Sequence, residues 1–209
     1  MELPPRHRIG FRGITVGIVL AAGAGSRYGM PKALVRDGGG WSWVGRACDT
    51  LRSGGCQRVI VVLGAESHRA VGLVPGWAEV VVAEEWRQGL SESLRAGLRA
   101  AEQTGAGAAV IIPVDTPTMP AGVVRRLLSR VDGLEQANAL RQATYAGAPG
   151  HPVVMGREHW HEAARTATGD RGARAYLAAH GAEAVECRDL WDGADVDRPA
   201  TQPGSPDVR

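Results

Sequence analysis

The sequence has few of the residues that mark several common protein classes. Its three cysteines are odd in number and lack the spacing of metal-binding pairs, which argues against a disulfide framework and favours a reducing compartment. Only 5% of the residues are aromatic, and the formal net charge is +2, so neither a base-stacking platform nor an electrostatic footprint for nucleic acid is evident. No apolar run reaches the length of a transmembrane helix. We therefore expect a cytoplasmic protein that binds neither nucleic acid nor a membrane.

The sequence does contain enough apolar residues for one domain. Of 209 residues, 44% are hydrophobic, which suits one substantial core better than two small ones. We expect a flexible N-terminus at 1–12, a single domain at 13–198 and a disordered tail at 199–209. The basic N-terminus and the apolar run after it also loosely resemble a signal peptide, but cleavage after Ala22 would destroy the glycine-rich loop that follows. A buried first strand is the better interpretation.

Short β-branched apolar runs alternate with helical patterns along the first two thirds of the chain. The predicted strands span 14–22, 58–63, 79–83 and 108–112. The predicted helices span 41–51, 66–73 and 91–102, and another starts at Pro120. This alternation predicts an α/β fold with a mostly parallel sheet and helices on both faces. Strands at 138–145 and 151–155 are predicted to form a small antiparallel insertion over the sheet edge, followed by a helix at 170–180 and a strand at 183–187.

The most informative stretch is LAAGAGSRYGMPKAL, which begins at Leu20 directly after the first predicted strand. Gly23 and Gly25 allow the backbone to turn sharply and to bring N–H groups close to an anion. Arg27 adds a planar fork of donors, and Lys32, which we expect on an exposed loop, adds a point charge. These features together predict a triphosphate site.

Two other phosphate-binding motifs fail at this position. A dinucleotide fingerprint, G-x-G-x-x-G, would need glycine where Tyr28 stands. A P-loop would need Gly-Lys-Ser/Thr, but Lys32 follows Pro31 and Ala33 replaces the hydroxyl.

A carboxylate follows the predicted strand at 108–112. Asp115 would face the crevice where α/β sheets bind ligands, and Mg²⁺ commonly uses one or two protein carboxylates together with substrate phosphates. Asp115 is therefore a candidate metal ligand, with a cap on the Thr116-Pro117 turn as the alternative.

The ordered set of motifs resembles the MobA-like nucleotidyltransferases, in particular their molybdenum cofactor cytidylyltransferase (MocA-like) branch. The resemblance begins with Leu-Ala-Ala-Gly-x-x-x-Arg-x-Gly-x-Pro-Lys-x-Leu and covers about residues 14–199. Its further segments lie at 89–98, 113–117, 150–154, 169–174 and 195–199. It implies a three-layer Rossmann-like nucleotide-diphosphosugar-transferase fold, with a mostly parallel sheet and a small antiparallel insertion.

The resemblance also implies an activity and a set of site residues. The activity is Mg²⁺-dependent transfer of CMP from CTP to a molybdopterin-type cofactor with release of pyrophosphate, and the product would pass to a molybdoenzyme. The implied catalytic residues are Arg27, Lys32 and Asp115. The implied nucleotide-binding residues are Leu20, Ala21, Ala22, Gly23, Ala24, Gly25, Ser26, Arg27, Lys32, Gly89 and Ser93. The implied acceptor residues are His151, Asp170 and Arg171, and the implied metal ligands are Asp115 and Asp197, with Asp195 less favoured.

Several alternatives stay open at this point. Asp197 could be a solvated residue of the tail, His151 a turn residue before Pro152, and Asp170 a helix cap. The base could be guanine, and the acceptor could differ. An NAD(P)H-dependent reductase of a quinone-like pigment (nicotine blue oxidoreductase type) is a second enzyme class, and a carrier of the pterin cofactor is a third possibility.

Overall fold

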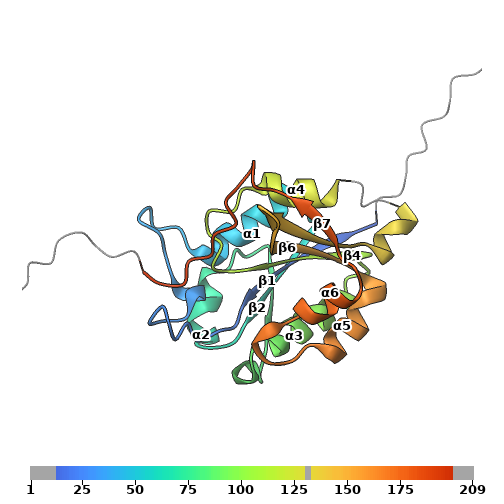
Figure 1. Cartoon of the computed structure of the whole chain (residues 1–209). Helices are drawn as coiled ribbons and strands as arrows, with labels where there is room; N and C mark the ends of the chain where they lie inside the picture. The colour runs from blue at the N-terminus through green and yellow to red at the C-terminus, as the bar shows by residue number, and fades with distance from the viewer. Residues whose placement is uncertain (1–12, 130–132, 200–209) are drawn as a thin grey trace, which may run out of the picture.

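A seven-stranded sheet runs through the middle of the molecule in the order β3-β2-β1-β4-β6-β5-β7 (Figure 1). The computed structural model describes residues 13–129 and 133–199. Strand β6 is antiparallel to both of its neighbours, whereas the other pairs are parallel. The strands are β1 (Thr15–Ala21), β2 (Arg58–Leu63), β3 (Glu79–Val82), β4 (Ala108–Pro113), β5 (Leu140–Tyr145), β6 (Ala148–Gly156) and β7 (Glu183–Glu186).

Helices cover both faces of this sheet. The α-helices are α1 (Trp43–Gly54), α2 (Ser67–Ala70), α3 (Leu90–Glu102), α4 (Ala121–Leu128), α5 (Trp160–Thr166) and α6 (Arg174–Ala179). The 3-10 turns are η1 (Lys32–Leu34), η2 (Val71–Leu73), η3 (Trp86–Gln88), η4 (Gly133–Asn138), η5 (Arg157–His159) and η6 (Gly169–Arg171).

Two hydrophobic cores lie on the two faces of the sheet. Helices α1 and α4 enclose one core, and α3, α5 and α6 enclose the other (Figure 1). Successive residues of β1 enter different cores, so that Val19 packs on the α1 side and Ile18 on the α3 side. Because both faces are buried, β1 has no polar alternation and appears in the sequence as a continuous apolar run. These three layers confirm the predicted fold class.

Some element boundaries differ from the sequence-based prediction. Helix α1 begins at Trp43 because the Ser42 side chain accepts a hydrogen bond from Gly45 N–H and caps the helix. The helix predicted at 66–73 divides into α2 and η2. The helix predicted at 170–180 begins only at Arg174, because Gly172, at φ +51° and ψ −130°, interrupts the chain after η6.

The two strands predicted as an insertion belong to the central sheet. Strand β6 pairs with β4 along Ala108–Ile111, and β5 and β7 continue the sheet beyond it. They therefore extend the sheet sideways and do not lie over its edge.

The sheet has a topological switch point beside β1. The chain leaves β1 through α1 to reach β2 on one side, and it enters β4 on the other side from α3. Loops that follow β1 and β4 therefore diverge at their carboxyl ends and leave a crevice, which is the usual ligand position in such sheets.

Two sequence-based predictions fall partly or wholly on undescribed residues. The segment 1–12 and residues 200–209 of the predicted tail lie outside the described part of the chain. Among the helices that the structure does describe, none combines the length and the apolar character that crossing a bilayer requires.

Candidate active site

The loop after β1 is a tight turn that Gly25 makes possible. The N–H groups of Tyr28 and Gly29 donate to the Gly25 carbonyl at 2.9 and 2.8 Å. Gly25 has φ +64°, and a Cβ at this position would collide with the Met30 carbonyl oxygen, so only glycine suits it. Gly23 is exposed with open space beside it. This part of the loop is therefore accessible to an anionic ligand.

Lys32, the only lysine in the sequence, lies between two carboxylates. Its Nζ is 2.9 Å from Asp115 Oδ2 and 2.9 Å from Asp197 Oδ1. The Lys32 side chain is only 13% exposed, so the prediction of an exposed loop position is wrong. The reason is that the two aspartates close over the ammonium group. Arg27 Nη1 lies 2.6 Å from Asp197 Oδ2 and leaves most of its side chain in solvent.

The charges of this cluster reinforce one another. Burial opposes the charge of Lys32, but its hydrogen bonds to Asp115 and Asp197, together with their charges, raise the pKa of the ammonium above its ordinary value. The Lys32 hydrogen bond is the main cause that lowers the pKa of Asp197, and Arg27 adds to it. Lys32 is therefore cationic and Asp197 anionic at neutral pH.

A third carboxylate, Asp195, completes the acidic group. One oxygen from each of Asp115, Asp195 and Asp197 lies within 4.8 Å of the others. Asp197 reaches Asp115 because Val196 N–H donates to the Asp115 backbone carbonyl at 2.9 Å. Asp195 and Asp197 line one cavity and Val196 lines another, which is the side-chain alternation of an extended segment.

The donor set of this group fits a hard divalent cation. All three side chains offer carboxylate oxygens, which Mg²⁺ and Mn²⁺ prefer. Among the described residues, the buried Asp115 Oδ1 has no hydrogen-bond partner. A buried acceptor without a partner is costly, and a cation would satisfy it.

A cavity of about 710 Å³ opens beside Asp195 and Asp197. The predicted site residues that line it are Leu20, Arg27, His151, Asp170, Arg171 and Asp197. The structure thus brings the predicted acceptor residues to the same cavity as the start of the glycine-rich loop. Gly89 lies against this region too, because a Cβ there would be 2.8 Å from Asp170 Oδ1. Asp170 lies in η6 and does not cap α6, whose N-cap is Ala173.

His151 on β6 also presents an unsatisfied polar atom. Its Nδ1 is buried and meets no partner in hydrogen-bonding geometry within the described chain. Burial lowers the pKa of the imidazole, while the Ile111 backbone and the charges of Asp115 and Asp195 oppose that effect. His151 is therefore neutral at neutral pH, and its buried Nδ1 has no partner among the described residues.

Of the predicted nucleotide-binding residues, only Leu20 and Arg27 line the cavity, and three of the others have buried side chains. Ala21 and Ala22 are each 2% exposed, and Ser93 on α3 is 4% exposed. Only their backbone groups, or the space that such small side chains leave, remain for a base. The remaining loop residues, Ala24 and Ser26, belong to the turn around Gly25, where Ser26 is exposed.

An α/β sheet whose switch point joins a glycine loop, a buried lysine and three carboxylates defines a class of enzymes that bind nucleotide phosphates. The model of the MobA-like NTP transferase domain matches residues 17–185. The chain therefore belongs to the MobA-like NTP transferase family, and it is a nucleotidyltransferase of that type.

Individual relatives differ in the activity that their names give. Nicotine blue oxidoreductase from Paenarthrobacter nicotinovorans is 32% identical over 197 residues, which cover 87% of this chain and 91% of that protein. A probable molybdenum cofactor guanylyltransferase from Rhodopirellula baltica is 29% identical over 104 residues, which cover 50% of this chain and 49% of that protein.

The fold is similar to that of Rv0371c from Mycobacterium tuberculosis H37Rv. That crystal structure superposes with a TM-score of 0.73 at 27% identity and covers 90% of this chain and 94% of its own. A second structure of Rv0371c, in complex with manganese, has a TM-score of 0.64 at 24% identity and covers 83% and 88% of the two chains.

Proposed function

We propose that this protein is a Mg²⁺-dependent cytidylyltransferase that transfers CMP from CTP to a phosphate of a molybdopterin-type cofactor. The observation that carries the proposal is the cluster of Lys32 with Asp115 and Asp197, next to the glycine loop at the switch point of the sheet. Such a cluster combines a cation for the triphosphate with carboxylates for a metal. Family membership supports the same reaction type.

The phosphate side of the reaction would be handled by the glycine loop and two cations. Loop amides near Gly23, the Arg27 guanidinium and the Lys32 ammonium would bind the triphosphate and neutralise its leaving group. An acceptor phosphate oxygen forms the new bond to the α-phosphorus. The α–β anhydride bond breaks, and pyrophosphate leaves with its electron pair. Positioning and electrostatic stabilisation carry most of the rate in such transfers.

Asp115, Asp195 and Asp197 would hold the divalent cation, which when bound supplies positive charge at the reacting phosphates. The manganese complex of Rv0371c supports a metal in this fold. Lys32 Nζ pairs with Asp115 Oδ2 and Asp197 Oδ1, so a cation held by these carboxylates would compete with the ammonium and weaken its hold. Lys32 would then be free to contact the triphosphate.

The base and the acceptor are the finer parts of the proposal. The Leu-Ala-Ala-Gly sequence before Gly25 resembles the motif of the cytidylyl branch. The side chains of Ala21 and Ala22 are small and buried, and the pocket wall that they form would suit a pyrimidine. The relative named as a guanylyltransferase makes GTP the alternative, and it supports a pterin-type acceptor. His151, Asp170 and Arg171 line the acceptor end of the cavity, and the product would pass to a molybdoenzyme.

Pyrophosphate release is the direct test. CTP with Mg²⁺ and molybdopterin should give release that exceeds that with GTP or ATP at least tenfold. CTP at a hundredfold excess over its Kd should stabilise the fold by about 2.7 kcal/mol, which is a melting shift of roughly 5–11 °C for a chain of this size. More pyrophosphate release with GTP than with CTP would refute the cytidylyl assignment alone. No release with molybdopterin and any triphosphate would refute the molybdopterin-type acceptor.

The relative from P. nicotinovorans supports a second candidate, reduction of a quinone-like pigment with NAD(P)H. Against it stands the absence of the G-x-G-x-x-G pattern in the loop after β1, where Tyr28 takes the third glycine position. Oxidation of NADPH with such an acceptor, followed at 340 nm in the same preparation, separates the two candidates.

A further inference from the structure

Two of the three carboxylates are carried by a segment that has no regular secondary structure. We call residues 187–198, which follow β7, the strap. It runs from β7 back to the end of β4 and the loop after β1 (Figure 1). Asp195 and Asp197 occupy their positions only while this segment lies against the sheet, so its contacts decide whether the acidic group is complete.

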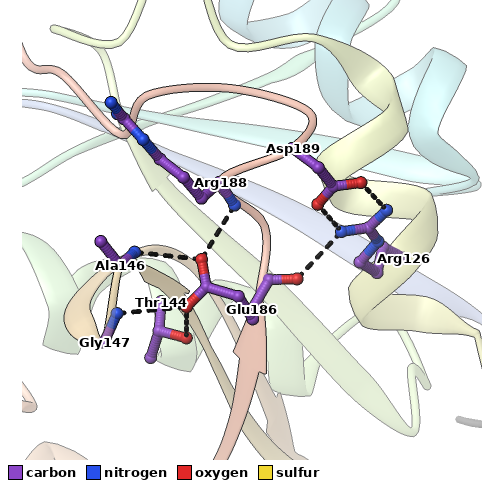
Figure 2. A network of polar contacts seen from close by, with 7 residues as sticks. All are labelled: Arg126, Thr144, Ala146, Gly147, Glu186, Arg188 and Asp189. Carbon is purple, nitrogen blue, oxygen red and sulfur yellow. Dashed lines mark hydrogen bonds and ion pairs between the residues drawn. The ribbon is translucent and has the colours of Figure 1, made fainter.

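The start of the strap is fixed by the network in Figure 2. The Glu186 carboxylate accepts hydrogen bonds from Ala146 N–H at 3.0 Å, Gly147 N–H at 3.2 Å and Arg188 N–H at 3.0 Å. The Arg126 guanidinium on α4 makes a two-bond ion pair with Asp189. The same guanidinium donates to the Glu186 carbonyl at 2.9 Å (Figure 2). This end of the strap is therefore tied both to the β5–β6 turn and to α4.

The middle of the strap packs against Tyr145 at the end of β5. Trp191 meets the Tyr145 ring edge-to-face at 5.4 Å between centroids, and its indole N–H donates to Thr118 Oγ1 at 3.1 Å. Gly193 lies directly on the same ring, since any Cβ there would collide with it. The Tyr145 hydroxyl donates to the His151 carbonyl at 2.7 Å. One residue thus supports both the strap and the strand segment that carries His151.

We propose that Tyr145 is a positioning residue, which holds the strap and the His151 segment in one fixed arrangement and thereby sets the affinity of the acidic group for a divalent cation. The inference rests on the metal site of the proposed function. When only a fraction of molecules has the strap docked, the apparent affinity falls by that fraction. Disturbing the contact between Tyr145 and the strap therefore weakens metal binding without touching a ligand.

The sharpest perturbation is Gly193→Ala, and the chain offers a matched control. Gly193 has φ +80°, and a methyl group there strikes the Tyr145 ring. Gly181 has φ +63° with nothing within 4 Å of its would-be Cβ, so Gly181→Ala carries a similar backbone strain without the collision. Gly181 lies in the turn before β7 and outside the strap.

Direct titration with Mn²⁺, read by electron paramagnetic resonance of the free ion, is the test. We expect Gly193→Ala to raise the Kd at least tenfold and Gly181→Ala to leave it within twofold of wild type. Hydrogen exchange should rise in the peptide that covers 194–198 for Gly193→Ala only. A Kd for Gly193→Ala equal to that of Gly181→Ala overturns the inference.

A second variant keeps the test valid if Gly193→Ala folds poorly. Asp189→Asn weakens the ion pair at the start of the strap, and Glu162→Gln weakens an exposed ion pair on α5, away from the strap. Asp189→Asn should raise the Mn²⁺ Kd severalfold and Glu162→Gln should not; equal values count against the inference. A wild-type protein that binds Mn²⁺ but is insensitive to both strap variants refutes only the role of Tyr145. A wild-type protein that binds no Mn²⁺ refutes the metal site of the proposed function as well.

Discussion

Replacing Lys32 by methionine should destabilise the fold, strengthen metal binding and abolish transfer at the same time. Methionine keeps the apolar stem and removes the ammonium that bridges Asp115 and Asp197. Each hydrogen bond to a charged group contributes about 1.5–3 kcal/mol, but the 36% exposure of the Asp197 side chain and the entropy of the long lysine chain reduce the sum. We estimate a net loss of about 2–3 kcal/mol, which lowers the melting temperature by roughly 4–12 °C.

Metal binding should change in the opposite direction. Without the ammonium, Asp115 Oδ2 and Asp197 Oδ1 lose their shared partner, and of the two basic side chains only Arg27 still competes with a divalent cation for the Asp197 carboxylate. We expect the Mg²⁺ affinity of Lys32→Met to rise at least tenfold, which corresponds to about 1.4 kcal/mol. Added Mg²⁺ should therefore raise the melting temperature of the variant more than that of the wild type. Pyrophosphate release should still fall about a hundredfold or more, because the triphosphate loses a preorganised cation.

Two controls make this result specific. Arg58→Met removes an exposed ion pair with Glu79 at the edge of the sheet and should cost at most about 1 kcal/mol, with no effect on metal binding. Lys32→Arg keeps the charge, but the planar fork does not fit a position only 13% exposed, so transfer should remain at least tenfold reduced. Activity of Lys32→Met within a few-fold of wild type, or equal Mg²⁺ stabilisation of both proteins, would refute the reasoning.

Two further predictions concern Asp115 and His151. Asp115→Asn should lose Mg²⁺-dependent pyrophosphate release, and more nucleotide should not restore it. The control Asp49→Asn, on the exposed part of α1, should behave like wild type. If Asp115→Asn shows normal metal dependence, Asp115 has a structural role only. Because burial lowers the pKa of folded His151 below its unfolded value of about 6.5, its stabilising contribution is complete above pH 6.5 and is lost as the pH falls through the folded pKa. Urea unfolding should therefore show that the free energy of unfolding falls more between pH 7.5 and pH 4.5 for wild type than for His151→Gln. Equal falls for the two proteins would contradict the lowered pKa of His151.

The parts of the fold that the sequence predicts well are those whose pattern is local. The central strands β1, β2 and β4 are buried on both faces and therefore appear as uninterrupted apolar runs. Asp115 could be located because it follows such a run. Strand β6 has a recognisable apolar pattern as well, but the pattern does not encode its neighbour. Its antiparallel place beside β4 depends on long-range pairing, and the sequence therefore predicted it at the sheet edge.

Two features of the site that local sequence patterns do not reveal depend on the strap. Asp195 was the less favoured ligand, yet it lies in the acidic group because Asp195 and Asp197 alternate around Val196 in the strap. The burial of Lys32 follows from Asp197, which is 165 residues away in the sequence. No local window contains both partners of such a contact.

The composition nevertheless holds a signal for the centre of the site. Of 24 basic residues, 23 are arginine, and the single lysine stands where two carboxylates converge. Arginine serves this chain both at exposed pairs such as Arg58 with Glu79 and at the nearly buried side of the Arg141 pair with Glu183. In the proposed mechanism, the cation between Asp115 and Asp197 is compact and leaves its carboxylates when a metal or a triphosphate binds. The one lysine of the sequence thus stands at the place where the proposed chemistry requires a small and movable charge.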